Sequence, residues 1–143
     1  MSASLIAALV CSVILLVIAA CFLMGSVPLL ILKHDTPLDA RFVGGFFKLY
    51  FVATTYAALA TAASYGLAGK PALALGAAAL ALLAYGLRRV LVPLMAALVP
   101  RIQAREAGAV LAFRRLHAGL ILVNLATLAV MVWSLIRLSM AMR

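Results

Sequence analysis

The stretch Phe113-Arg114-Arg115-Leu116-His117-Ala118-Gly119-Leu120-Ile121-Leu122-Val123-Asn124 opens the last long apolar segment of the chain. A helix turns about 100° per residue, so Phe113, His117, Leu120 and Asn124 fall on one face. The residues that follow, 125–136, are almost wholly hydrocarbon. The stretch therefore predicts a helix that crosses a membrane and carries a polar stripe inward from one end.

The whole chain is too apolar for a soluble domain. It has 143 residues, of which 69% are hydrophobic, and long apolar segments recur four times. We predict an all-α membrane protein, a bundle of four transmembrane helices with short loops, forming one domain over residues 1–143. The predicted spans are approximately 5–32, 43–67, 72–97 and 112–138.

The charge of the chain is strongly basic, with twelve Lys and Arg against three acids and a formal charge of +9. In a soluble protein this would suggest nucleic acid as a partner. Here the basic residues flank the apolar segments, as in proteins that contact lipid head groups, so nucleic acid is not expected. The expected partners are the lipid bilayer and other membrane subunits or a second copy of the chain. The predicted head-group contacts are Arg88, Arg101, Arg105 and Arg114.

The distribution of basic residues also predicts the orientation. The loops after the first and third spans, with their flanks, hold nine of them, and the opposite side holds three. Because cytoplasmic loops are enriched in Lys and Arg, both termini are predicted to be periplasmic in a bacterial inner membrane. The nine are Lys33, Arg41, Lys48, Arg88, Arg89, Arg101, Arg105, Arg114 and Arg115, and the three are Lys70, Arg137 and Arg143.

Local signals mark the helix ends. Thr36 and Pro37 are typical of a helix start, and a short interfacial helix is expected to lead into the second span. Residues 90–100 contain Pro93 and continue the third helix or bend along the interface, and the sequence leaves these two alternatives open. Cys11 and Cys21 would lie about 15 Å apart on one helix, too far for a disulfide.

Two spans carry stripes suited to helix contact in lipid, where small and hydroxyl side chains allow close approach. The stripe of the second span consists of Tyr50, Thr54, Thr61 and Ser64. That of the third span consists of Ala72, Gly76, Ala79 and Gly86.

Catalytic motifs are missing from the sequence: there is no phosphate-binding glycine loop, paired metal-ligand spacing or serine–histidine–acid arrangement. The predicted site is instead a polar cluster with three possible roles. It fixes helix packing, binds a small molecule or ion at the cytoplasmic mouth, or binds haem or another metal through His117 with His34. No carboxylate pattern supports the histidines as metal ligands. The cluster comprises Tyr50, Arg89, Phe113, Arg115, His117 and Asn124.

Three stretches carry a family resemblance. Phe113-x-Arg115-x-His117 followed by Asn124, Arg89-Val90-Leu91-Val92-Pro93, and Phe46-Phe47-Lys48-Leu49-Tyr50-Phe51 resemble motifs of the domain-of-unknown-function 4149 class, which is related to eukaryotic transmembrane protein 205. The resemblance implies a four-helix fold but no activity, since the family has no established biochemical function. The link of its eukaryotic relatives to platinum-drug resistance hints at metal or drug handling.

The chain also departs from the family pattern. Val92 stands where the family often has an acid, and Leu120 stands where it often has a small hydroxyl residue. The first helix lacks the expected glycine-rich pattern. These departures remove polar groups and favour a packing role for the cluster.

Together these observations predict a non-enzymatic accessory or structural subunit that packs against a larger inner-membrane complex. The first alternative is an independent transporter of a small anion or metal. The second is a membrane protein that handles haem or copper.

Overall fold

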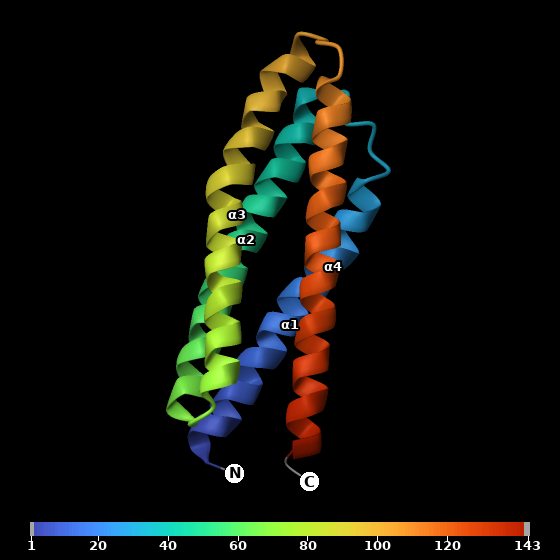
Figure 1. The fold of residues 1–143 in the computed structure, drawn as a ribbon. Helices are drawn as coiled ribbons and strands as arrows, with labels where there is room; N and C mark the ends of the chain where they lie inside the picture. The colour runs from blue at the N-terminus through green and yellow to red at the C-terminus, as the bar shows by residue number, and fades with distance from the viewer. Residues whose placement is uncertain (1, 142–143) are drawn as a thin grey trace.

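Four long helices joined by short loops make up the computed structural model, which describes residues 2–141 (Figure 1). They are α1 (Ala3–Leu29), α2 (Pro37–Leu67), α3 (Pro71–Gln103) and α4 (Ala109–Ala141). Each is long and apolar enough to cross a membrane. The predicted all-α four-helix fold is therefore confirmed.

The helices alternate in direction, so the loops fall at two ends (Figure 1). Loops 30–36 and 104–108 lie at one end, called the loop end here. The turn 68–70 and both ends of the described chain lie at the other, called the terminal end. Helices α2 and α3 pack closely, α1 packs on α2, and α4 makes fewer contacts with α1 and α3.

The start of α2 follows the predicted capping chemistry. The Thr36 hydroxyl accepts a hydrogen bond of 3.2 Å from the Asp39 amide, and Pro37 occupies the first turn, where its missing N–H costs nothing. The interfacial segment and the second span form one continuous helix. Helix α3 likewise continues through Pro93 and Pro100 as one unbroken helix.

The largest buried core lies toward the loop end and is rich in aromatic side chains. Phe22 stacks on Phe46 and Tyr50, with ring centroids 5.2 and 3.8 Å away, and meets Phe47 edge-on at 4.9 Å. Gly25 allows this approach of α1 and α2, because a Cβ there would lie 2.7 Å from Cζ of Phe46. The cluster joins all four helices, with Phe113 from α4 and Met95 from α3.

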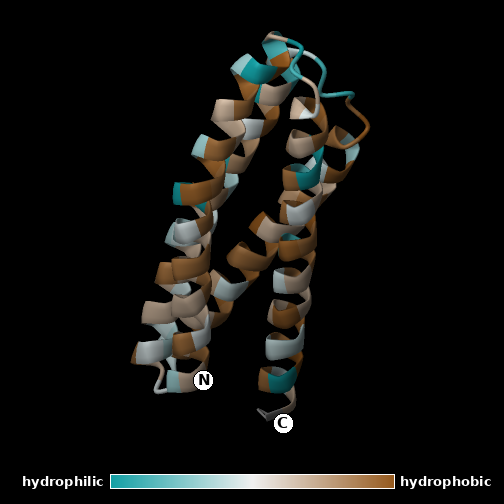
Figure 2. Ribbon diagram, turned by 45° about the horizontal axis from the view of Figure 1, so that its top comes forward, coloured by the Kyte–Doolittle hydropathy of each residue, from teal (hydrophilic) through white to brown (hydrophobic). Residues whose placement is uncertain are grey.

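Large apolar side chains cover the outside of the bundle. Leu67 is 81% exposed and Leu82 is 72% exposed. Such a surface would drive aggregation in water, and it suits contact with lipid chains. Hydrophilic residues gather mainly at the loop end (Figure 2). The chain is therefore an integral membrane protein, and both of its cysteines are free thiols.

Candidate functional site

The two histidines of the chain meet inside the loop end of the bundle. Nε2 of His34 lies 3.1 Å from Nδ1 of His117, and both side chains are fully buried. His117 points inward from α4, whereas His34 comes from the loop after α1. His34 adopts a left-handed backbone conformation with φ of +57°, which few residues other than glycine adopt.

The hydrogen bonds of this pair define its proton arrangement. Nδ1 of His34 bonds to the Leu32 carbonyl, which can only accept, so Nδ1 carries a proton. When His34 is neutral its Nε2 is an acceptor, and Nδ1 of His117 must donate to it. The other nitrogen of His117, Nε2, then has a bare lone pair with no hydrogen-bond partner among residues 2–141. The backbone carbonyl of Ser26, another acceptor, lies beside this ring.

Aromatic rings pack against the histidine pair. Phe113 lies 5.3 Å from the His34 ring, and Phe47 meets the His117 ring edge-on at 5.2 Å. Within the described chain, no carboxylate or cationic side chain is hydrogen-bonded to either ring. The neighbouring charged residues in the sequence, Lys33, Asp35, Arg114 and Arg115, have exposed side chains.

In this arrangement the histidine pair has one free lone pair for a metal ion, that of His117 Nε2. Residues 2–141 contain no group of three or more histidine, cysteine and acidic side chains that could hold a metal. Structural metal sites normally use four protein ligands, with carboxylates or carbonyls supporting the histidines. Haem or copper binding by His117 and His34 stays a prediction.

Deeper in the bundle, one hydrogen-bonded chain joins three helices. The Tyr50 hydroxyl of α2 donates to Oδ1 of Asn124 on α4 at 2.5 Å, and Nδ2 of Asn124 donates to the Ala19 carbonyl of α1 at 3.1 Å. Asn124 is 2% exposed. Asn124 therefore bonds to two neighbouring helices.

The arginines predicted to join this cluster lie apart from it. Arg89 and Arg115 are exposed, and neither is hydrogen-bonded to His117 or Asn124. Arg114 and Arg105 are also exposed, and Arg88 is half-buried. The structure thus brings together His34, His117, Phe113, Tyr50 and Asn124, but not the arginines.

Arg101, one of the predicted head-group contacts, also has a protein partner. Its guanidinium donates to both oxygens of Glu106 at 2.7 and 2.6 Å across the loop between α3 and α4. This hydrogen-bonded pair holds the pKa of the Glu106 carboxyl below its ordinary value.

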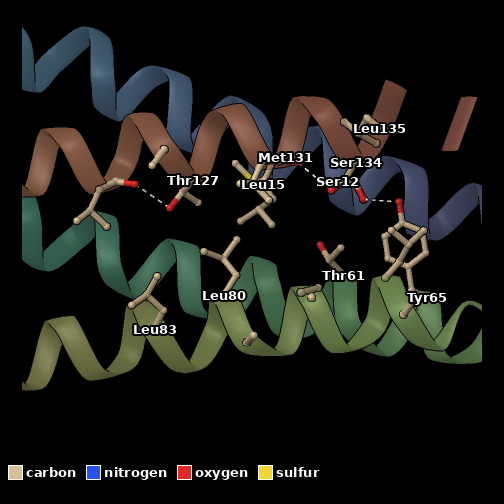
Figure 3. A pocket seen from close by; sticks show the side chains of 18 residues that line it. Ser12, Leu15, Thr61, Tyr65, Leu80, Leu83, Thr127, Met131, Ser134 and Leu135 are labelled. Atoms are coloured by element: carbon tan, nitrogen blue, oxygen red, sulfur yellow. Dashed lines mark hydrogen bonds between the residues drawn. The ribbon is translucent and has the colours of Figure 1, made fainter. Parts of the chain in front are cut away.

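Sequence patterns did not indicate a groove of about 520 Å³ that lies toward the terminal end. Figure 3 shows Leu15 and Met131 on one side of it and Leu80 and Thr61 on the other. The lining contains no lysine, arginine, histidine or carboxylate. The clues in the sequence were the two stripes of small and hydroxyl residues. Ala72, Gly76 and Ala79 of the third-span stripe and Thr61 of the second-span stripe line the groove.

The groove hydroxyls are already bonded within the protein. The Ser12 hydroxyl donates to the Ala8 carbonyl at 2.8 Å and is also hydrogen-bonded to the Tyr65 hydroxyl at 3.0 Å. Thr127 and Ser134 each donate to a carbonyl one turn earlier on α4. Their free hydrogen-bonding capacity is therefore small, and the groove presents mainly hydrocarbon.

Comparison with models of protein families, with curated proteins and with solved structures finds no match. The fold defines the class of the protein as a four-helix integral membrane protein. Buried polar side chains form hydrogen bonds between its helices, and the groove of about 520 Å³ is lined mainly by apolar residues. The resemblance to the domain-of-unknown-function 4149 class stays a prediction.

Proposed function

We propose that the protein is a non-enzymatic accessory subunit that packs against a transmembrane helix of a larger bacterial inner-membrane complex. The observation that carries this proposal is the small-residue stripe of α3. Ala72, Gly76 and Ala79 line the groove and are exposed there, without a covering helix in the described chain.

Such a stripe suits a second helix because packing in lipid depends on close approach of backbones. Small residues permit that approach, and van der Waals contact then supplies the stabilisation. A Cβ placed on Gly76 would meet nothing within 4 Å, so the space beside it is open. The occupant we propose is an apolar transmembrane helix of another subunit, which would replace lipid along this stripe.

The chemistry of the groove favours a helix over a hydrated solute. A polar solute crossing the membrane needs polar or charged groups to replace its water. The groove has no charged lining residue, and its hydroxyls bond to its own helices. An independent transporter stays the alternative, and flux into liposomes containing the pure protein would support it.

The proposal also includes an orientation of the protein in the membrane. Basic residues concentrate toward the loop end, where Lys33, Arg105 and Arg114 lie. Because positively charged segments stay in the cytoplasm, the loop end faces the cytoplasm and the terminal end faces the periplasm. Labelling of single cysteines placed at residues 69 and 107 in intact cells tests this arrangement.

The experiment that tests the function is purification of the tagged protein from native membranes in a mild detergent. Mass spectrometry of the purified material then measures the stoichiometry of whatever accompanies it. A fixed ratio to the subunits of one membrane complex is expected. Recovery of the protein alone, or only with copies of itself, would contradict the proposal.

A further inference from the structure

We propose that Lys48, Arg88 and Arg89 form a binding site for the phosphate groups of an anionic phospholipid. The site lies in a crevice between α2 and α3 and does not depend on the partner proposed above. Its volume is about 410 Å³, and the other lining residues are Tyr85, Val92 and Pro93.

The site gathers cations from two helices. Lys48 belongs to α2, and the adjacent pair Arg88 and Arg89 belongs to α3. The guanidinium carbon of Arg89 lies 5.9 Å from the centre of the Tyr85 ring, a contact that restrains the direction of this side chain. Arg88 is half-buried, so part of its surface is already removed from solvent.

These three charges are not neutralised by the protein. No acidic residue lines the crevice, and the one ion pair in the described part of the chain joins Arg101 to Glu106. Like charges held together repel one another, and a bound anion relieves that repulsion. Arginine binds phosphate oxygens with two parallel N–H groups, and lysine adds a compact charge, so phosphate is the ligand chemistry that fits.

The position along the helix identifies lipid as the source of the phosphate. Arg88 lies about 25 Å from Pro71 along the axis of α3, close to the roughly 30 Å thickness of the hydrocarbon layer. The segment between them, residues 72–87, contains no charged side chain. If that segment crosses the hydrocarbon, the crevice lies at the level of the head groups, where basic pockets between transmembrane helices bind anionic lipids.

The chain provides a matched control for a test. Arg88→Gln/Arg89→Gln removes two adjacent charges from the crevice. Arg114→Gln/Arg115→Gln also removes two adjacent charges, but Arg114 and Arg115 belong to α4 and line neither the crevice nor the groove. Native mass spectrometry of both variants and of the wild-type protein would measure retention of phosphatidylglycerol, cardiolipin and phosphatidylcholine. Lys48→Gln is a third, milder variant at an exposed position of α2.

The wild-type protein is expected to retain the two anionic lipids in preference to phosphatidylcholine. Arg88→Gln/Arg89→Gln should weaken this retention roughly thirtyfold, the effect of two cations next to an anionic surface. Lys48→Gln should weaken it by a smaller factor, and Arg114→Gln/Arg115→Gln should leave it within about twofold of wild type.

Three results would overturn the proposal. One is an equal loss in the two double variants, which would reduce the effect to net charge. Another is equal retention of anionic and zwitterionic lipid by the wild-type protein. The third is displacement of the lipid by inorganic phosphate at micromolar concentration, which would identify a soluble phosphate as the ligand. Helix content measured by circular dichroism checks that each variant is folded.

Discussion

Nε2 of His34 lies 3.1 Å from Nδ1 of His117, so residues 83 positions apart close the loop end of the bundle through one hydrogen bond. Nδ1 of His34 already donates to the Leu32 carbonyl, and Nε2 of His117 has no hydrogen-bond partner among the described residues. One added proton converts this Nε2 from an unsatisfied acceptor into a donor. A second proton would set two N–H groups against each other. The folded histidine pair can therefore bind one added proton but not two.

We predict that the folded protein takes up at most one added proton at the two histidines, whereas the unfolded chain takes up two. Free histidine takes up its proton near pH 6.5. Below that pH the unfolded state binds more protons, so the free energy of unfolding falls as pH falls, by about 1.4 kcal/mol per pH unit. The stability is fully present above pH about 6.5 and is lost on acidification.

Nitrogen NMR of protein labelled at histidine, without a polyhistidine tag, measures the proton count. The chain has only two histidines and thus four ring nitrogens. No more than three protonated nitrogens are expected as long as the protein stays folded. Four protonated nitrogens in a folded protein would contradict the prediction.

The Tyr50–Asn124–Ala19 hydrogen bonds should contribute measurably to stability. Asn124→Leu removes both bonds between the helices, and it leaves the Tyr50 hydroxyl without this acceptor and the Ala19 carbonyl with only the backbone bond of its own helix. The loss is expected to cost about 1–2 kcal/mol. Tyr50→Phe removes one bond and should cost about half as much. Unfolding by sodium dodecyl sulfate measures both, and their double-mutant cycle gives the coupling.

Thr127→Ala is the control, because the Thr127 hydroxyl bonds only to its own helix. Thr127→Ala should change the free energy of unfolding by less than about 0.5 kcal/mol. If Asn124→Leu is as stable as this control, the hydrogen bonds between the helices do not hold the bundle together.

The contact of Gly25 with Phe46 predicts opposite effects of the same substitution at two glycines. Gly25→Ala places a Cβ 2.7 Å from Cζ of Phe46, whose ring is held by stacking on Phe22. Gly45→Ala meets nothing within 4 Å and gains helix propensity. We expect Gly25→Ala to be less stable than Gly45→Ala by about 1–2 kcal/mol, measured by the same unfolding assay. Equal stability would show that Phe46 moves aside freely.

The Arg101–Glu106 pair should make a small, pH-dependent contribution. The arginine hydrogen bonds lower the pKa of Glu106, so the contribution is present above the ordinary carboxyl pKa and is lost as pH falls through the lowered value. Both side chains are about half exposed, and solvent therefore screens the pair. Glu106→Gln should melt slightly below wild type at pH 7 and equal to it near pH 3. A difference that persists unchanged at pH 3 would have another cause.

Helix periodicity and composition were sufficient to predict the four helices and the face of α4 that carries Phe113, His117, Leu120 and Asn124, all of which are buried. They did not predict that His34 enters the core, because its left-handed backbone depends on how the loop packs. Apolar side chains cover both the lipid-facing and the inward sides of these helices. No amphipathic pattern therefore indicated that α3 and α4 would leave a groove between them. Lys48 and Arg88 line the same crevice only because α2 packs against α3, which the sequence likewise did not predict.

The proposed accessory role is tested most directly by comparing two glycines of α3. Gly76 lines the groove and Gly86 does not, and a Cβ at either position meets nothing within 4 Å. Both glycines are exposed, so we expect leucine at either site to leave the core of the bundle unchanged, whereas only Gly76→Leu adds a side chain to the groove. Quantitative purification from native membranes in mild detergent measures the amount of partner per copy of each variant. We expect Gly76→Leu to lose the partner that wild type and Gly86→Leu retain. Equal partner retention by both variants would contradict the proposal that a helix packs in this groove.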